Sequence, residues 1–508
     1  MDIKKAKQEI KNTIRAYLKK DSYGNYKIPI VKQRPILLIG ASGIGKTAIM
    51  EQIARECNIA IVSYTITHHT RQSAIGLPFI KQKIYGGKQY SVTEYTMSEI
   101  IASVYEKMEQ TALTEGILFI DEINCVSETL APAMLQFLQN KTFGTHAIPK
   151  GWIIVAAGNP PEYNKSVREF DIVTLDRVKK IEVKQDFEVW KEYAYKESIH
   201  GAILSYLEIK KDNFYTVETT VDGKYFVTAR GWEDLSRIME VYEELNMTID
   251  EDVIYQYVQH KEIAKDFANY LDLYYKYKND YHINEILQGN IAKNALEKLS
   301  NAYFDERLSV IGLLLSRLGE NFKNVYCTNL FITSLHDILK ELKNDMIESK
   351  ELPYEILSKT IEIQKQIFQK QKTANLLDTL EIQSSIIVLD ILQNYQKEIE
   401  QKAIKNGNEA FEYIKQHFNV LLQKREKEIT QTTEYLNNAF LFLEKAFGEN
   451  QEIVIFITEL TSNYYSIKFI NENGSEKYYH YNQSLLFQQG RKEILQKIAE
   501  VTEELKMI

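Results

Sequence analysis

The sequence predicts an α/β protein with a mainly parallel sheet in its first third and a mostly helical remainder. Seven of the eight prolines lie at or before Pro161, so the later part holds few residues that interrupt helices. Before Pro161, short apolar runs alternate with longer amphipathic stretches, which is the pattern of βα units around a buried parallel sheet. The 508 residues are enough for three or four domains.

The first 185 residues divide into a helix and a sheet domain. Residues 1–33 open with charged and apolar residues at helical spacing, which predicts an N-terminal helix. Residues 34–185 form the predicted α/β core. Its candidate strands are the apolar runs 35–39, 59–64, 117–120 and 152–157.

Residues 186–281 form a second, smaller helical domain in this interpretation. A small hairpin interrupts it in the stretch VETTVDGKYFVTAR, where Asp222-Gly223 is a strong turn signal. Residues 282–450 keep apolar side chains at three-and-four spacing among Lys, Glu and Gln. They predict long amphipathic helices, either bundled together or docked on a partner.

The last segment, residues 451–508, predicts a small β-meander followed by a terminal helix. The stretches IVIFITELTSN, YYSIKFINENG and SEKYYHYNQSLLF are rich in β-branched and aromatic residues and are separated by turn signals. Asn473-Gly474 is the clearest of these turns, and the final helix follows Gly490.

Composition narrows the class of protein. Apolar residues make up 44% and charged residues 26%, and the net charge is −8, so no global basic field favours nucleic acid or anionic membranes. Three cysteines without a CxxC pair fit neither a disulfide framework nor a zinc knuckle. No signal peptide and no stretch of ~20 apolar residues is evident. We therefore expect a cytoplasmic protein that does not bind membranes.

A glycine-rich loop is the first chemical motif. It matches G-x-x-x-x-G-K-[ST] and lies between an apolar strand and an amphipathic helix, the context that a phosphate-binding loop requires. Lys46 would bridge the β- and γ-phosphates of a nucleotide, and Thr47 would bind Mg²⁺. The predicted nucleotide-binding residues of the loop are Gly40, Ala41, Ser42, Gly43, Ile44, Gly45, Lys46 and Thr47.

Two carboxylates follow the strand at 117–120, at the strand end where open α/β sheets bind ligands. Asp121 is placed to bind the magnesium ion, and Glu122 is placed to polarise an attacking water. A solvated turn would also accept two adjacent acids, but their position downstream of the phosphate loop favours nucleotide hydrolysis.

Three further polar residues are candidates for the same site. Asn159 ends the strand at 152–157 and can bond a water or a γ-phosphate without adding charge; an ordinary Asn-Pro turn is the alternative. Arg177 and Arg230 can each stabilise charge on a γ-phosphate, although any one arginine more often forms a surface salt bridge.

These elements in this order resemble the AAA+ ATPases, and the surrounding residues resemble the MoxR branch, over residues 30–280. The sharpest similarity lies in GNPPEY at 158–163 and FDIVTLDR at 170–177. The resemblance implies that Asn159 is sensor 1, Arg177 the arginine finger acting on a neighbouring subunit, and Arg230 sensor 2. It also implies that 186–281 is a helical lid domain.

The same resemblance implies ATP and Mg²⁺ as cofactors and a hexameric homo-oligomeric ring. MoxR-type proteins are chaperone-like and remodel or mature a client, often with a separate partner that carries a von Willebrand factor A domain. Residues 68–95 fit the insert in the second core helix, and 141–151 fit a short hairpin before sensor 1. Val178 departs from the family's usual Phe, and Arg168 competes with Arg177 for the finger role.

Other functions stay open. A nucleotide-gated scaffold with little turnover would account for the long helical region, although it would not need Glu122 as a base. A GTP-using AAA+ motor of the restriction type is a second alternative, while the Asn/Thr-Lys-x-Asp element of classical GTPases and the Leu-Ser-Gly-Gly signature of ABC proteins do not occur. The acidic balance disfavours work on nucleic acid.

Overall fold

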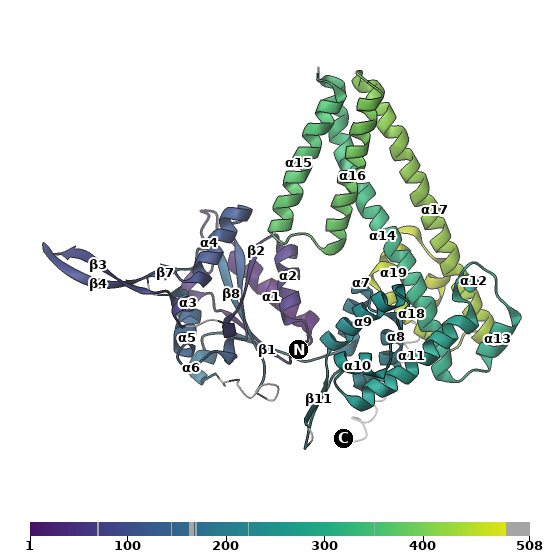
Figure 1. The fold of residues 1–508 in the computed structure, drawn as a ribbon, viewed down its shortest axis with the longest axis horizontal. Helices are drawn as coiled ribbons and strands as arrows, with labels where there is room; N and C mark the ends of the chain where they lie inside the picture. Colours follow the sequence, from purple (N-terminus) through teal and green to yellow (C-terminus); the bar gives the residue numbers. More distant parts are fainter. Residues whose placement is uncertain are drawn as a thin grey trace, which may run out of the picture. The chain divides into compact units, whose positions relative to one another are not determined.

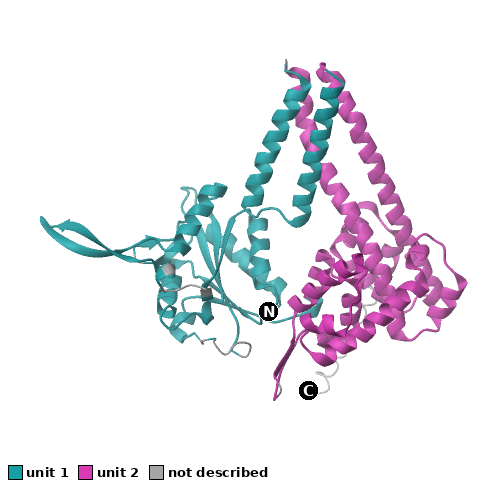
Figure 2. Cartoon of the chain, viewed as in Figure 1, with its two compact units in different colours: residues 1–189, 350–404 teal, residues 190–349, 405–508 magenta. Residues whose placement is uncertain are grey.

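A computed structural model describes residues 1–68, 71–143, 145–161, 167, 170–221, 223–349 and 351–483 (Figure 1). The chain divides into two compact units (Figure 2). The first comprises Met1–Val189 and Lys350–Ile404, and the second comprises Trp190–Ser349 and Lys405–Ile508.

The centre of the first unit is a five-stranded parallel sheet in the order β2-β5-β8-β1-β9. The strands are β1 (Ile36–Gly40), β2 (Ala60–Thr65), β5 (Gly116–Asp121), β8 (Trp152–Gly158) and β9 (Lys179–Val183). Because β1 lies between β8 and β9, the strand order reverses beside it, and such switch points bind ligands in open α/β sheets. The predicted parallel sheet is confirmed.

Helices cover both faces of this sheet. Alternate residues of one strand enter different cores: Ile36 and Leu38 pack with α1 and α2, whereas Leu37 packs with α4 and α5. Both faces are therefore buried, which explains why the strands are continuously apolar rather than alternating. The helices are α1 (Ile3–Leu18), α2 (Lys46–Cys57), α4 (Glu99–Thr111) and α5 (Ala131–Asn140).

The first unit also contains two hairpins and several short helices outside the central sheet. Two antiparallel hairpins form where the sequence indicated inserts, and Figure 1 shows the longer one extending away from the sheet. They are β3 (Pro78–Tyr85) with β4 (Lys88–Tyr95), and β6 (Thr142–Phe143) with β7 (His146–Ala147). The other short elements are η1 (Ile30–Lys32), η2 (Ile66–His68), α3 (Arg71–Ile75), η3 (Ile123–Cys125) and α6 (Ile172–Leu175).

One helical hairpin from the second half of the chain belongs to this first unit. It consists of α15 (Pro353–Thr373) and α16 (Thr379–Gln401), which pack against each other. The end of α15 lies on α4, where Lys107 Nζ donates to Thr373 O at 2.6 Å. Burial at this contact lowers the pKa of Lys107. The predicted long helices thus include one pair that docks on the nucleotide core.

The second unit begins within α7 and contains the predicted small hairpin. Its first elements are α7 (Phe187–Glu197), α8 (Gly201–Ile209), η4 (Lys211–Phe214), β10 (Thr216–Thr220), β11 (Gly223–Val227), α9 (Ala229–Glu244), α10 (Glu251–Tyr257) and α11 (Lys261–Tyr281). β10 and β11 pair antiparallel, which confirms the hairpin; Asp222 of its predicted turn lies outside the described residues.

The remaining helices of the second unit pack around α14, which contacts α8, α11, α17 and α19. They are α12 (Ile283–Leu287), α13 (Lys293–Ser300), α14 (Phe304–Glu348), α17 (Gly407–Phe447), α18 (Gln451–Ser462) and α19 (Tyr464–Asn473). A buried ion network ties the two ends of this unit together, because Lys191 of α7 donates to Glu208 of α8 and to Glu459 of α18, each at 2.8 Å. No described helix is long and apolar enough to span a bilayer.

The predicted β-meander at 451–508 is wrong for the described part of that segment. Residues 451–462 and 464–473 are helices, and residues 476–483 are helical as well. Ile453, Phe456 and Leu460 are buried at helical spacing against the rest of the unit, and this packing overrides the β propensity of the segment. Asn473-Gly474 ends a helix instead of joining strands. The predicted helix after Gly490 lies outside the described residues.

Candidate nucleotide site

The glycine-rich loop joins the end of β1 to the start of α2. Gly43 and Gly45 have φ values of 75° and 89°, which residues with a side chain rarely adopt. A Cβ on Gly40 would lie 2.9 Å from Val183 O, so this position also requires glycine. No side chain caps the start of α2, and the backbone N–H groups at the start of a helix favour an anion.

Lys46 joins the loop to the neighbouring strand. Its side chain is buried, with 7% of the residue exposed. Its Nζ donates to Gly40 O and Ala41 O at 2.8 Å and to Asn159 Oδ1 at 2.9 Å. The structure therefore brings together two predicted site residues 113 positions apart in the sequence.

Thr47 and Asp121 meet at the head of α2 and the end of β5. Thr47 Oγ1 donates to Asp121 Oδ2 at 3.0 Å, and Asp121 Oδ1 accepts from the backbone N of Glu122 at 2.9 Å. A hydroxyl and a carboxylate within hydrogen-bonding distance form a donor set that Mg²⁺ accepts. These two residues therefore fit the predicted ion, which would polarise phosphate oxygens when bound.

Glu122 has an unusual backbone conformation. Its φ is 57°, in the left-handed region that a residue with a side chain seldom occupies. Its Oε2 accepts from Thr67 Oγ1, which follows β2, at 2.9 Å. Strained conformations of this kind cluster at functional sites because the surroundings must hold them. Thr67 was not among the predicted site residues, since a single threonine after a strand gives no distinctive signal.

Asn124 is a second residue of the cluster that was not predicted from the sequence. Its Nδ2 donates to Asn159 O at 2.8 Å, and its Oδ1 accepts from Asn159 N at 3.3 Å. A Cβ on Gly158 would lie 2.5 Å from the same Oδ1, so glycine is needed there. Asn124 is buried and fixes the backbone of Asn159. An asparagine so soon after the paired carboxylates was the available signal.

Both predicted arginines are exposed, and the side-chain bond of Arg177 lies outside this cluster. Arg177 is exposed after α6, and one of its terminal nitrogens donates to Gln139 Oε1 of α5. Arg230 is exposed in the first turn of α9 and belongs to the second unit. Arg168, the competing candidate, lies outside the described residues.

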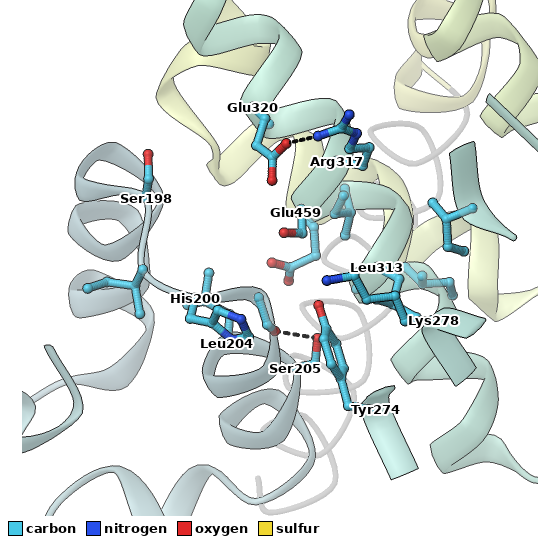
Figure 3. Close-up of a pocket in the computed structure, with 18 of the residues that line it drawn as sticks. Ser198, His200, Leu204, Ser205, Tyr274, Lys278, Leu313, Arg317, Glu320 and Glu459 are labelled. Carbon is cyan, nitrogen blue, oxygen red and sulfur yellow. Dashed lines mark hydrogen bonds and ion pairs between the residues drawn. The ribbon is translucent and has the colours of Figure 1, made fainter. Parts of the chain in front are cut away.

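A large cavity of about 900 Å³ lies elsewhere, within the second unit (Figure 3). Glu459, Lys278 and Tyr274 line it, and none of the predicted site residues does. His200 donates to Glu243 at its wall, which lowers the pKa of Glu243 to about 2. Glu459 pairs with Lys191, and Glu320 pairs with Arg317, within the same unit. Among the described residues, no three His, Cys, Asp or Glu side chains gather to bind a metal.

Comparison with known proteins agrees with the geometry of the first unit. Residues 36–176 match the family described as the ATPase family associated with various cellular activities (AAA). The matched range contains the loop, the carboxylate pair and Asn159. No curated protein matches the chain. The match supports an ATPase of the AAA+ type, a family whose members generally bind ATP with Mg²⁺.

Proposed function

We propose that this chain is an ATP-hydrolysing ring ATPase of the MoxR type that remodels or matures a partner protein. The observation that carries the proposal is the cluster at the carboxyl ends of β1, β5 and β8. There Lys46 bonds Asn159, and Thr47 bonds Asp121. The chain supplies in one place a cation for phosphates, oxygen ligands for Mg²⁺ and, in the adjacent Glu122, a base.

Hydrolysis needs a base that can take a proton from water near the γ-phosphate. Glu122 is suited to this task because it directly follows Asp121 at the end of β5, and Thr67 holds its carboxylate through a hydrogen bond. Asn159 would orient the same water without repelling it. A binding switch would not require a carboxylate held in this way.

A ring would complete the site. Arg177 lies on an exposed surface beside Ile172, which is 84% exposed in a short helix. An exposed arginine next to exposed apolar side chains is suited to a contact with a second copy of the chain. AAA proteins typically assemble into rings, so we assign Arg177 to the site of a neighbouring subunit and Arg230 to a sensor role from the lid.

Work on a client is the proposed purpose of the cycle. The β3–β4 hairpin exposes apolar side chains beyond the core. Two pairs of packed helices, α15–α16 and α14–α17, are not needed for nucleotide hydrolysis itself. A client protein, or a separate partner with a von Willebrand factor A domain, would engage these elements.

The test compares the steady-state ATPase rate of the wild type with that of Glu122→Gln. We expect the variant to lose at least ~10²-fold in rate because it lacks the base, while it still binds ATP. Glu128→Gln, an exposed carboxylate nearby, is the control and should keep the rate. Equally negligible rates in wild type and variant would favour the scaffold, and a preference for GTP would favour the restriction-type motor.

A further inference from the structure

The β3–β4 hairpin forms a sheet of its own. Its two strands pair only with each other among the described residues, and most of their residues are exposed. The connecting residues Gly86 and Gly87 have φ values of 58° and 78°, as in the type I′ turn of a two-residue hairpin loop. An isolated two-stranded hairpin is marginally stable in water, so a further strand would stabilise it.

The register gives the two faces of the hairpin opposite chemistry. Directly opposed residues share a face, and each strand alternates between faces. One face is uncharged and consists of Pro78, Ile80, Gln82, Ile84, Gln89, Ser91, Thr93 and Tyr95. The other face is basic and aromatic and consists of Phe79, Lys81, Lys83, Tyr85, Lys88, Tyr90, Val92 and Glu94.

The basic face has more cations than anions. Lys81 and Lys83 share the single carboxylate of Glu94, and Lys88 adds a third positive charge. The chain as a whole carries −8. The hairpin is therefore a local basic surface on an acidic protein, and a ligand with negative charge fits it.

The edge of β3 offers unpaired backbone groups. A two-residue loop makes Tyr85 and Lys88 a hydrogen-bonded pair, so alternate residues of β3, starting with Ile84, direct their backbone groups outward. Gln82 and Ile80 follow in the same series. At the base of β4, by contrast, Tyr95 O accepts from His146 Nε2 at 3.1 Å. This contact occupies one outward backbone group of β4, whereas the charged pair Lys81 and Lys83 lies on β3.

A second copy of the chain does not suit this edge. Antiparallel pairing of two β3 strands centred on Gln82 would oppose Lys81 of one copy to Lys83 of the other. Like charges directly opposite each other destabilise a sheet and protect natural edge strands from self-association. A strand that carries carboxylates at those positions would instead gain two charge pairs.

We propose that the β3 edge binds an extended segment of a client protein as an added strand. Its acidic side chains lie beside Lys81 and Lys83, and its apolar side chains lie beside Ile80 and Ile84, which are 75% and 73% exposed. The client segment therefore alternates acidic and apolar residues. The inference rests on the proposed function for its role in the ATPase cycle, but the binding itself can be measured without turnover.

The probe is a fluorescent 12-residue peptide of alternating Glu and Val, titrated with the full-length chain and followed by anisotropy. A peptide of the same composition with its Glu and Val residues in two blocks is the control, and it should bind at least ~10-fold more weakly because only alternation matches the period of a strand. The double variant Lys81→Gln with Lys83→Gln should bind the alternating peptide roughly tenfold more weakly, because the charge pairs are lost.

Proline substitution tests backbone pairing with a matched control. Gln82→Pro removes an outward N–H from β3, and Ser91→Pro removes the equivalent group from the directly opposed residue of β4. We expect Gln82→Pro to weaken peptide binding by roughly tenfold or more and Ser91→Pro to leave it within about twofold. Circular dichroism of both variants verifies that they fold alike.

Three results would overturn the inference. The first is equal binding of the alternating and block peptides, and the second is an equal effect of the two proline substitutions. The third is a single-stranded oligonucleotide that binds more tightly than the alternating peptide and whose affinity is unchanged by Gln82→Pro. Basal ATPase should be unchanged in every hairpin variant because the hairpin lies outside the nucleotide cluster. A wild-type chain without ATPase activity would refute the proposed function and leave the peptide result standing.

Discussion

Two buried lysines show how the units differ. Lys46 of the first unit, 7% exposed, donates to two backbone carbonyls and an amide oxygen at the open end of the sheet. Lys191 of the second unit, 2% exposed, donates to two carboxylates from separate helices. Phosphate oxygens could replace the neutral partners of Lys46, whereas loss of a carboxylate from Lys191 would leave a buried charge.

Burial of a charged side chain serves two different purposes in this chain. In the first unit the polar side chains converge at the carboxyl ends of the strands, and their hydrogen bonds join loops that follow different strands. In the second unit the ion pairs join helices that are far apart in the sequence. Burial lowers the pKa of an isolated lysine, yet Glu459 and Glu208 outweigh that effect and hold the pKa of Lys191 above its usual value.

The largest effect is expected from a variant that tests whether the nucleotide site of the first unit is complete within one subunit. We predict that Arg177→Ala lowers the ATPase rate by ~10³-fold or more and leaves ATP affinity nearly unchanged, because the guanidinium stabilises charge only in the transition state. Arg317→Ala, an exposed arginine paired with Glu320, is the control. Rates come from a coupled assay and affinities from a fluorescent ATP analogue.

Mixing two inactive variants sharpens the same prediction. A ring made of Arg177→Ala and Glu122→Gln subunits contains interfaces where an intact Glu122 faces an intact Arg177. Partial recovery of activity on mixing would place the arginine in the neighbour's site. Full activity of a monomer, unchanged by Arg177→Ala, would contradict the shared site.

The second prediction concerns a substitution that breaks the ion network of the second unit. Lys191→Met should lower the free energy of unfolding of the second unit by about 3–5 kcal/mol, because it leaves Glu459 buried without its cation. Lys210→Met removes an exposed pair with Asp266 and should cost less than about 1 kcal/mol. Urea unfolding followed by far-ultraviolet circular dichroism measures both.

A double variant separates charge from packing. Lys191→Met with Glu459→Leu removes both charges and should recover most of the stability lost by Lys191→Met. If the double variant is as unstable as the single one, the network acts through packing or through the bond from Tyr195 to Glu459.

The site could be predicted from sequence largely because its residues occur at strand ends. A glycine-rich loop followed by two carboxylates after apolar strands is a specific pattern for nucleotide binding, and a parallel sheet brings such strand ends to one edge. Thr67 and Asn124 escaped prediction because their role is to hold Glu122 and Asn159, and a positioning residue needs only a hydrogen bond. No local pattern marks such a partner.

The helical half was harder to predict for a physical reason. Three-and-four spacing indicates a helix but not the surface against which the helix packs. Nothing local showed that α15–α16 docks on α4 while α14 and α17 pack in the other unit. At 451–473, β-branched and aromatic residues favoured strands by propensity, and burial of Phe456 and Phe469 among helices decided otherwise.

A third buried lysine offers an intermediate case between Lys46 and Lys191. Lys141 lies after α5, and its Nζ donates to Ile30 O at 3.0 Å. Burial lowers its pKa from 10.5 to about 8. The unfolded chain therefore holds this proton up to a higher pH than the folded chain, and the free energy of unfolding should rise between pH 8 and pH 10.5.

Replacement of Lys141 tests that sign. The shift of 10.5 − 8, about 2.5 units, corresponds to about 3 kcal/mol, so Lys141→Met should stabilise the first unit near pH 7.5 and lose this advantage by pH 10.5. Lys150→Met changes an exposed lysine and should show no such pH dependence. Melting temperatures across this range measure the difference, and a constant difference would contradict the predicted titration.

The smallest expected effect concerns how the first unit holds Asn159. Asn124→Ala removes the two bonds to the Asn159 backbone, which should destabilise the first unit by about 1–3 kcal/mol because a partly buried N–H and C=O lose their partner. It should also lower kcat several-fold while ATP affinity changes little, since Lys46 and the loop remain.

Asn124→Asp can accept from Asn159 N but cannot donate to its carbonyl, so it should retain part of the stability and still lower kcat. A fall in stability with unchanged kcat in both variants would limit Asn124 to a structural role, and the polar contacts of the first unit would then resemble those of the second.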